Sequence, residues 1–418
     1  MREEAGYYLP QMTGKCLGCG GQLPAAFLDL GEMPLANSYI EPENKGKEEI
    51  LYKLAVAYCP VCHLVQITHR VAPQDMFSDY MYFSSFSGAF LKHAEAMAEN
   101  LAGRFSLGTN SLVMEVGSND GYLLNYFQEK GIPVMGIEPA GNICRIANER
   151  GIPTMEVFFG SDTVDEILRE KGPADIIIGN NVLAHIPLIN DFMLCVNKCL
   201  KTGGSAIFEF PYLQALLDHT EFDTIYHEHV FYYSLSAIKI LAERAGLSLY
   251  DVSMQDIHGG SLRVFLQKGK KSDITPNVER MLTKEASYGI TNRGVYDDFA
   301  ERVAKLKVKL IQLLIELKRG GKTLAAYGAA AKGSTLLNYI GAGNDLIDFV
   351  VDRSIYKQGK CMPGVHLPIS PPSRLLEAMP DYTLLLAWNF ADEIIGQQAE
   401  YLERGGRFII PVPEPIMV

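Results

Sequence analysis

The chain has 418 residues, of which 48% are hydrophobic and 21% charged, and its formal net charge at pH 7 is −11. This length predicts about two to four domains, and the acidic balance argues against nucleic-acid binding because it offers no basic surface for phosphates. No apolar run is long enough to span a bilayer and no secretory signal is visible, so we expect a cytoplasmic protein that does not enter a membrane.

Two cysteine pairs lie early in the chain, in the strings Cys16-Leu-Gly-Cys19 and Cys59-Pro-Val-Cys62. Two residues between cysteines allow both thiolates to reach one tetrahedral ion. Gly18 and Gly20 allow left-handed turns that aim backbone amides at the sulfur atoms. The spacing predicts a closed, structural zinc site with four thiolate ligands, although the loop between the pairs is longer than usual. Disulfide bonds are the alternative.

Residues 1–75 are therefore expected to form a small zinc-binding module, because few long periodic runs occur there. A helix is expected from Phe86 to about Gly103, where apolar residues fall on roughly one face. Short apolar strands then alternate with helix-length segments. The expected strands are 112–116, 134–138, 175–178 and 205–209. This alternation predicts an α/β domain over residues 76–268 with a parallel, doubly wound sheet.

Two further strands, over 247–252 and 262–267, are expected after a helix over 235–246. A helical connector over 269–320 follows, with one long helix from about Tyr296 to Arg319 that stops at Gly320-Gly321. Alternation then restarts in residues 321–418. The expected strands there are 323–327, 346–351, 382–387 and 407–411. We predict a second, smaller doubly wound α/β domain.

The string Glu115-Val-Gly-Ser-Asn-Asp-Gly121 joins a predicted strand to a helix. Such a turn brings backbone amides and a helix N-terminus against a ligand. Gly117 and Gly121 occupy glycine positions. Asn119 stands where a middle glycine is usual, and Asn tolerates a left-handed backbone better than most residues. Glu138, about twenty residues further on, is placed to accept hydrogen bonds from ribose hydroxyls.

The spacing alone also fits a dinucleotide dehydrogenase. However, the loop lacks the G-x-G-x-x-G fingerprint, and its acidic residues Glu115 and Asp120 suit a cationic or amino-acid-bearing ligand better than a pyrophosphate. The string Asn180-Asn181-Val-Leu-Ala-His185 follows the third strand, at the ligand edge of an open sheet. Asn180 and Asn181 are therefore candidate cofactor contacts, or they cap the following helix.

The most reactive stretch runs from Phe222 to Ser234 and contains Tyr226-His227-Glu228-His229 among aromatic residues. A histidine near apolar walls keeps a pKa close to neutrality, and a nearby Glu or Tyr can orient it or stabilise an oxyanion. The cluster therefore favours catalysis over buried, structural histidines. Metal ligation by His-x-His with an acid is a further alternative, but no third histidine lies at a suitable spacing.

Three other stretches are candidate substrate contacts. Ser78-Asp-Tyr-Met-Tyr-Phe-Ser-Ser85 is either a packed linker or a substrate wall. His258-Gly-Gly-Ser-Leu-Arg263 has the glycine freedom of a close-approach loop. Tyr327-Gly-Ala-Ala-Ala-Lys-Gly-Ser-Thr335 follows a strand and opens a helix, so its amides, Lys332 and Ser334 suit a phosphate. Tight packing of the helix on the strand through small residues explains this last string equally well.

These motifs together resemble the S-adenosylmethionine-dependent sugar C-methyltransferases of deoxysugar biosynthesis. The resemblance extends over nearly the whole chain, and Tyr226-His-Glu-His229 and Tyr327-Gly-Ala-Ala-Ala-Lys-Gly333 are its most specific parts. It implies a Rossmann-like class I methyltransferase domain between the zinc module and the C-terminal domain, with S-adenosylmethionine and a structural Zn²⁺ as cofactors. It also implies a nucleotide-linked 4-keto-deoxyhexose as substrate, methylated at C3. A monomer or weak homodimer is expected.

The resemblance also implies residue roles. His229 is the expected base, with Glu228 and Tyr226 beside it and a tyrosine from the 78–85 run, Tyr80 before Tyr82. The implied cofactor contacts are Glu115, Gly117, Asn119, Gly121, Glu138, Asn180 and Asn181. The implied substrate contacts are Tyr82, His185, His258, Arg263, Tyr327, Lys332 and Ser334, the last three in the C-terminal domain, which is expected to bind the sugar nucleotide.

The chemistry sets its own requirements. Carbon is a poor nucleophile until a neighbouring carbonyl acidifies its C–H bond, so the site needs a near-neutral base, donors for the enolate oxygen and exclusion of water. An O-methyltransferase, a C-methyltransferase acting on another keto acceptor, and a zinc-stabilised module that binds the cofactor without turnover are the alternative functions.

Overall fold

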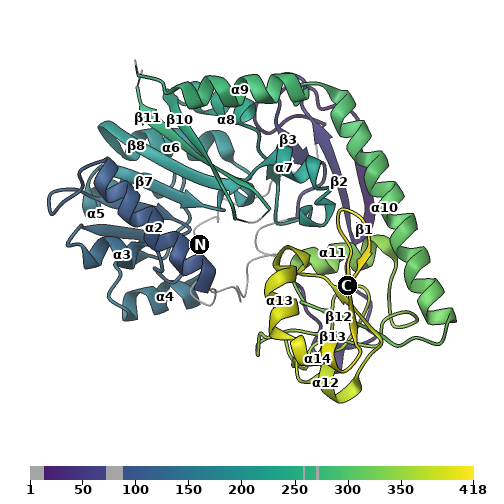
Figure 1. The fold of residues 1–418 in the computed structure, drawn as a ribbon. Coiled ribbons are helices and arrows are strands. Elements are labelled where there is room, and N and C mark those ends of the chain that lie inside the picture. Colours follow the sequence, from purple (N-terminus) through teal and green to yellow (C-terminus); the bar gives the residue numbers. More distant parts are fainter. Residues whose placement is uncertain (1–13, 72–87, 258, 270–272) are drawn as a thin grey trace, which may run out of the picture.

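The computed structural model describes residues 14–71, 88–257, 259–269 and 273–418 (Figure 1). These residues form three sheets, of four, seven and six strands. In Figure 1 the seven-stranded and six-stranded sheets belong to two separate bodies. The long helix α10 (Arg293–Arg319) runs along one side of the molecule and joins them.

The four-stranded sheet belongs mostly to the cysteine-containing segment, which also holds the short helix η1 (Pro42–Asn44). Its order is β1 (Leu28–Met33), β2 (Tyr52–Tyr58), β3 (Val65–Ile67) and β9 (Phe231–Tyr232), with every pair antiparallel. Strand β9 comes from the reactive stretch, more than 160 residues away in sequence from β3. A two-residue strand has no periodicity, so the sequence did not reveal this pairing.

The four cysteines of the two pairs converge on one point. The Sγ atoms of Cys16 and Cys62 are 3.5 Å apart, as are those of Cys19 and Cys59, and all four lie within 4.8 Å of one another. A tetrahedral zinc ion with four thiolates requires sulfur atoms about 3.8 Å apart, whereas a disulfide requires about 2.05 Å. All eight cysteines of the chain are free thiols. The zinc prediction is confirmed, and the disulfide alternative is wrong.

The glycine prediction for the first cysteine pair holds only in part. Gly20 has a φ of +73° and makes the expected left-handed turn. Gly18 does not, and it is required for close packing instead, since a Cβ there would lie 2.8 Å from Leu64 Cδ2. In the second pair the left-handed position is taken by His63, with a φ of +60°. The Gly18 carbonyl also accepts a hydrogen bond of 2.8 Å from Arg244, which attaches the knuckle to the neighbouring domain.

The seven-stranded sheet has the order β10-β11-β8-β7-β4-β5-β6. Its strands are β4 (Val113–Val116), β5 (Val134–Ile137), β6 (Thr154–Met155), β7 (Ala174–Asn180), β8 (Leu200–Pro211), β10 (Leu247–Gln255) and β11 (Ser261–Lys268). The helices are α2 (Gly88–Arg104), α3 (Leu124–Glu129), α4 (Gly141–Glu149), α5 (Val164–Lys171), η3 (Leu183–His185), α6 (Ile189–Cys199), α7 (Leu213–Asp218), η4 (Phe222–Thr224) and α8 (Leu235–Arg244). This is the Rossmann-like fold that the resemblance implied.

The strand order changes direction at β4, which lies between β5 and β7 and is parallel to both. The four strands predicted to form a parallel sheet are parallel to their neighbours among them. The two later strands, for which the sequence predicted no direction, extend the sheet with antiparallel pairs, since β11 pairs antiparallel with both β8 and β10. Only a short connection separates β10 from β11, and parallel neighbours need a long crossover. The ligand edge predicted at the carboxyl ends of β4, β5 and β7 is nevertheless present.

The C-terminal sheet has the order β14-β13-β12-β15-β16-β17. Its strands are β12 (Leu324–Tyr327), β13 (Val350–Val351), β14 (Ile369–Ser370), β15 (Tyr382–Leu385), β16 (Arg407–Ile410) and β17 (Ile416–Met417). The helices are α11 (Ala331–Ile340), α12 (Arg374–Ala378), η5 (Trp388–Phe390), α13 (Ala391–Gln397) and α14 (Ala399–Glu403). The strands are parallel except for β17. This confirms a second doubly wound domain.

The connector consists of α9 (Pro276–Tyr288) and α10, which ends before Gly320 as expected. One face of α10 is buried at intervals of three and four residues, at Tyr296, Phe299, Val303, Leu306, Leu310 and Leu314. Tyr296 packs on Tyr58 of β2 with ring centroids 4.7 Å apart. The helix is therefore fixed against the zinc module. In the described part of the chain, no helix combines the length and apolarity that crossing a bilayer demands.

We predict that the purified protein holds one zinc ion per chain and that Cys59→Ser gives misfolded protein, because metal binding supplies the folding free energy of such a module. Metal analysis with circular dichroism checks this. Cys361→Ser, outside the cluster, should retain one zinc. Exchange of zinc for cobalt should leave turnover nearly unchanged because the shell is closed. Folded, zinc-free protein would contradict the prediction.

Candidate active site

Buried hydrogen-bond acceptors line the carboxyl edge of β4 and β7. Glu115 is fully buried in β4, and neither of its carboxylate oxygens has a hydrogen-bond partner within the described residues. Burial raises its pKa well above the usual range. The side-chain oxygens of Ser118, Asn180 and Asn181 likewise lack described partners. Each such oxygen costs about 1–3 kcal/mol, so the edge is suited to a ligand rich in donors, such as an ammonium group with hydroxyls.

The loop after β4 has the backbone geometry predicted for a cofactor turn. Gly117 has a φ of +66°, and a Cβ there would lie 2.4 Å from Val182 Cγ1. Gly121 has a φ of +78°. Asn119 replaces the usual glycine with a φ of +49°, which confirms that it adopts the left-handed conformation. A Cβ on Gly121 would lie 2.8 Å from Ile152 Cγ1, so a side chain at either glycine would clash with its packed neighbours as well as strain the backbone.

Glu138 follows β5 and is 7% exposed. Its two carboxylate oxygens accept hydrogen bonds from the backbone amides of Asn119 and Ala140, each 3.0 Å long. Burial raises the pKa of Glu138, and these two bonds oppose the rise. Glu138 therefore holds the glycine loop from the neighbouring strand, a contact that the sequence did not predict.

Asn180 and Asn181 are not helix caps. The N-cap positions of the next two helices are Val182 and Leu188, and neither helix has a side-chain cap. Asn181 has a φ of +56°, and its amide donates to the Glu209 carbonyl at 2.7 Å. The capping alternative is therefore wrong, and both side chains stay at the ligand edge.

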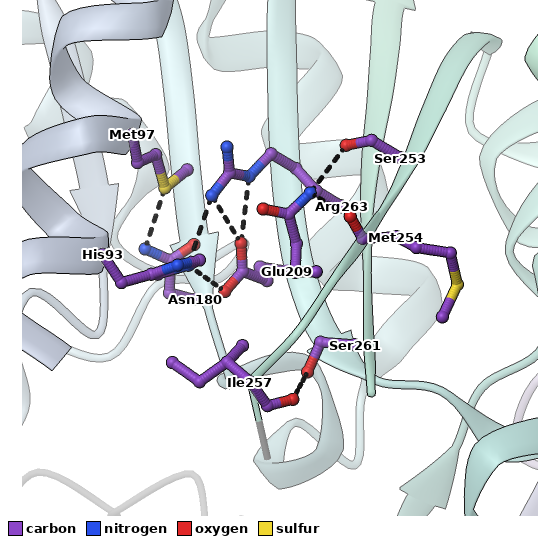
Figure 2. Close-up of polar contacts among 10 residues, drawn as sticks. His93, Met97, Asn180, Glu209, Ser253, Met254, Ile257, Ser261 and Arg263 are labelled. Carbon is purple, nitrogen blue, oxygen red and sulfur yellow. Dashed lines mark hydrogen bonds and ion pairs between the residues drawn. The ribbon is translucent and has the colours of Figure 1, made fainter. Parts of the chain in front are cut away.

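Arg263 lies in a buried polar cluster at this edge (Figure 2). Its Nε and Nη2 atoms lie 2.9 and 2.8 Å from Glu209 Oε2, and His93 Nε2 lies 2.7 Å from Glu209 Oε1. The Asn180 amide is near, with its nitrogen 3.5 Å from Met97 Sδ. Arg263 thus neutralises Glu209 beside the cofactor edge. Sequence reasoning missed His93 and Glu209. Glu209 could have been found, because it is an acid near the end of a strand, as Glu138 is.

The reactive string places its histidine and tyrosine in contact. The Tyr226 hydroxyl lies 2.7 Å from His229 Nε2, and His229 Nδ1 lies 3.1 Å from the Thr224 carbonyl oxygen. A carbonyl oxygen only accepts hydrogen bonds, so Nδ1 carries the proton and donates it to Thr224. The Nε2 lone pair therefore faces the Tyr226 hydroxyl, which is the arrangement of a proton acceptor.

His185, at the end of η3, packs edge-on against His229 with ring centroids 4.8 Å apart. Burial lowers the pKa of His185 to about 4, although a hydrogen bond to the Glu228 backbone opposes this. The Val230 amide donates to the Ala184 carbonyl at 2.7 Å, which attaches the string to η3. His185 therefore gives a neutral wall beside His229 at pH 7.

The other two ionisable groups of the string point elsewhere. His227 Nε2 lies 3.2 Å from the Tyr52 carbonyl of β2, and burial lowers the pKa of His227 to about 4. Glu228 accepts a 2.7 Å hydrogen bond from Asn37. Because His227 and His229 diverge, they do not form a metal site. Across the described ranges, the four cysteines are the one group that meets the geometry of a metal site.

The string around Lys332 faces the beginning of the reactive stretch. Lys332 Nζ lies 3.2 Å from Asn389 Oδ1 and 4.5 Å from the centre of the Trp388 ring. Trp388 in turn donates to Asp223 at 2.6 Å. Ser334 is buried and donates to the Ala36 carbonyl at 2.8 Å, so it holds the N-terminal segment.

The packing explanation also holds for part of this string. Tyr327 is buried at the end of β12, and a Cβ on Gly333 would lie 2.8 Å from Leu386 Cβ. Three predicted residues, Tyr80, Tyr82 and His258, lie outside the described residues.

Comparison with known families accounts for most of the chain. The zinc binding domain family matches residues 16–77, the methyltransferase domain family matches residues 90–252, and the C-methyltransferase C-terminal domain family matches residues 256–413. C-methyltransferase NovU of Streptomyces niveus is 38% identical over 405 residues, which are 97% of this chain and 96% of that protein.

Solved structures match a little under half of the chain. Magnesium protoporphyrin IX methyltransferase of Synechocystis with bound SAM is 13% identical and covers 47% of this chain and 89% of its own, with a TM-score of 0.33. An S-adenosylmethionine-dependent methyltransferase of Clostridium acetobutylicum is 10% identical, with a TM-score of 0.34. The match covers 47% of this chain and 96% of that protein's chain. The identity with NovU along almost the full length of both proteins carries the assignment. The chain therefore belongs to the C-methyltransferase family and is an S-adenosylmethionine-dependent, zinc-containing member of it.

Proposed function

We propose that this enzyme methylates C3, the carbon next to the ketone, of a nucleotide-linked 4-keto-deoxyhexose, with His229 as the base. The supporting observation is the pair of hydrogen-bond partners of His229, from which its tautomer follows. Its Nδ1–H donates to the Thr224 carbonyl, and its Nε2 lone pair faces the Tyr226 hydroxyl. A neutral imidazole held in this tautomer suits removal of a proton from carbon, because the opposite nitrogen is already stabilised for positive charge.

The proton removed from C3 goes to His229 Nε2, and its electron pair moves into the enolate. The new Nε2–H then donates to the Tyr226 oxygen, which releases the Tyr226 hydroxyl proton to donate to the enolate oxygen. The hydrogen bond between Tyr226 and His229 thus reverses its direction, and Tyr226 becomes free to stabilise the negative charge on the enolate oxygen. His185 and the surrounding buried aromatic residues exclude water from this step.

The methyl donor supplies an electrophilic methyl group on a sulfonium when it is bound. The unpaired oxygens of Glu115, Asn180 and Asn181 suit its amino-acid ammonium and its hydroxyls. Glu138, which already holds the glycine loop, is assigned to the ribose. Positioning two bound partners contributes roughly 7–11 kcal/mol to such transfers at best.

We assign the nucleotide to the C-terminal domain. Lys332 directly follows the loop after β12, at the start of α11, and Lys357 donates to the Ala329 carbonyl of that loop at 2.7 Å. Two ammonium groups at a glycine turn suit a diphosphate. Burial raises the pKa of Glu221 and of Asp223, and the charge of Lys332 opposes both rises, so part of that charge is already balanced.

Each domain then has a separate proposed role. In this assignment residues 1–75 form the zinc-binding module, 76–268 bind the methyl donor, 269–320 connect, and 321–418 bind the sugar nucleotide.

For the cofactor we predict that Glu138→Ala weakens S-adenosylmethionine binding by roughly 1.5–3 kcal/mol, because charge-assisted hydrogen bonds to the ribose are lost and the loop is released. Titration calorimetry measures this. Glu149→Ala, exposed at the end of α4, serves as the control and should bind as wild type. NAD should not bind measurably. Tight NAD binding without S-adenosylmethionine binding would reverse the assignment of this loop.

For the base we predict that His229→Ala loses methyl transfer and also donor-independent deuterium exchange at C3 of a nucleotide keto-sugar, each by about 10²–10⁴-fold. Mass spectrometry reads both. Tyr226→Phe should slow both to a lesser degree, and Tyr382→Phe in β15 should change neither. An O-methyltransferase would show no such exchange. Wild-type exchange in His229→Ala would place the base elsewhere.

For the nucleotide we predict that Lys332→Ala raises the KM for the nucleotide sugar with a smaller change in kcat, because phosphate contacts persist unchanged through methyl transfer. Steady-state kinetics checks this, with Lys305→Ala on the exposed face of α10 as the matched control. An unchanged KM would show that the Gly-Ala-Ala-Ala-Lys-Gly loop serves packing alone.

A further inference from the structure

The segment of residues 36–40, between β1 and β2, lies against the C-terminal domain although it belongs to the zinc-binding module. Its anchoring hydrogen bonds run from Ser334 Oγ to the Ala36 carbonyl (2.8 Å), from the Tyr39 hydroxyl to the Ala329 carbonyl (2.5 Å), and between the amides and carbonyls of Ile40 and Cys361 (3.0 and 2.8 Å). Lys357 also lies over the Tyr39 ring, 5.2 Å from its centre. The C-terminal domain thus fixes the backbone on both sides of Asn37.

Asn37 connects this segment to the reactive string. Its Nδ2 atom donates to Glu228 Oε1 at 2.7 Å, across 191 positions in sequence. Its Oδ1 atom lies 3.5 Å from the Tyr39 hydroxyl, at the limit of a hydrogen bond. The amide therefore presents a donor, not an acceptor, to the carboxylate. Within the four described ranges, Asn37 is the one residue that forms a hydrogen bond with the Glu228 side chain.

Glu228 needs such a donor because it is 6% exposed and no described cation forms an ion pair with it. Burial raises the pKa of Glu228 to about 7, and the Asn37 hydrogen bond lowers it. Among titratable groups, Tyr39 of the 36–40 segment interacts with the Glu228 charge, and His185 of η3 hydrogen-bonds the Glu228 backbone. Tyr226, His227 and His229 belong to the same string as Glu228. The Asn37 amide is a neutral donor that orients the Glu228 carboxyl group and stabilises its charged form.

We propose that Asn37 is a positioning residue for methyl transfer: it holds the carboxylate of Glu228, the residue that precedes the His229 base in the chain, while the C-terminal domain holds Asn37. The proposal rests on the proposed function for its kinetic part only. It makes the zinc-binding module a contributor to the active site as well as a structural support. Asn37 belongs to none of the sequence motifs that predicted the site, although its side chain contacts Glu228 of one of them.

A double-mutant cycle tests whether Asn37 acts through Glu228. Asn37→Leu removes the donor at similar size and should lower kcat about tenfold at pH 7, with S-adenosylmethionine affinity near wild type. In a Glu228→Gln background the same substitution should change kcat less than twofold. Equal losses in both backgrounds would overturn the proposal. Asn44→Leu, an exposed asparagine of η1, is the matched control and should leave kcat unchanged.

A second measurement needs no acceptor. In protein labelled with ¹³C-glutamate, the Glu228 carboxyl resonance is the one absent from Glu228→Gln. Because the Asn37 hydrogen bond stabilises the charged form, its removal should raise the titration midpoint by about one pH unit in Asn37→Leu. Asn37→Asp should raise it further by adding a like charge. Asn44→Leu should not move it.

An unchanged midpoint in both Asn37 variants would overturn the proposal. If wild-type enzyme fails to methylate any nucleotide keto-sugar, the proposed function fails, but the titration still decides whether Asn37 controls Glu228. A shifted midpoint with unchanged kcat would also overturn the proposal, because Asn37 would then set the charge of Glu228 without serving the reaction.

Discussion

The pairing of β9 with β3 fixes the active site. Val65 pairs with Tyr232 and Gln66 with Phe231, so the chain directly after His229 becomes the edge of the zinc module's sheet. The Val230 amide and carbonyl bond to Ala184 and Ile67 respectively, which holds the string between two domains. Zinc stabilises that sheet because Cys59 and Cys62 lie in the turn between β2 and β3 and share the ion's site with Cys16 and Cys19. The cysteine cluster thereby contributes to the placement of the residues that we propose carry the chemistry.

Burial between domains then sets the protonation of the site. Loss of water disfavours the charged form of each group, so His185 stays neutral and Glu228 titrates near neutrality. His229 differs in its partners, because one ring nitrogen lies against the Thr224 carbonyl and the other against the Tyr226 hydroxyl. Ionisable residues that lie close together thus differ in their surroundings, because each packs against a different part of the protein. A solvated peptide of the same sequence would show none of these differences.

The residues that we propose bind the cofactor gather at a single sheet edge. Glu115, Asn180 and Asn181 reach that edge from β4 and β7, which are adjacent and parallel. The left-handed conformations of Asn119 and Asn181 direct the chain around the space that a ligand needs. The neighbouring Glu209 is neutralised by Arg263 and bonded by His93, so it adds little free negative charge.

The sequence by itself determined the zinc site, the two doubly wound domains and the left-handed turn at Asn119, because each depends on local spacing or on residue type. Tertiary structure decided the antiparallel place of β11, the divergence of His227 from His229, the bond between Arg263 and Glu209 and the contact of Asn37 with Glu228. These features join segments far apart in the chain or depend on which way one side chain turns in a buried site. Periodicity and spacing report a residue's own neighbours along the chain, whereas pairing, burial and hydrogen bonding are set by the surfaces that fold against it.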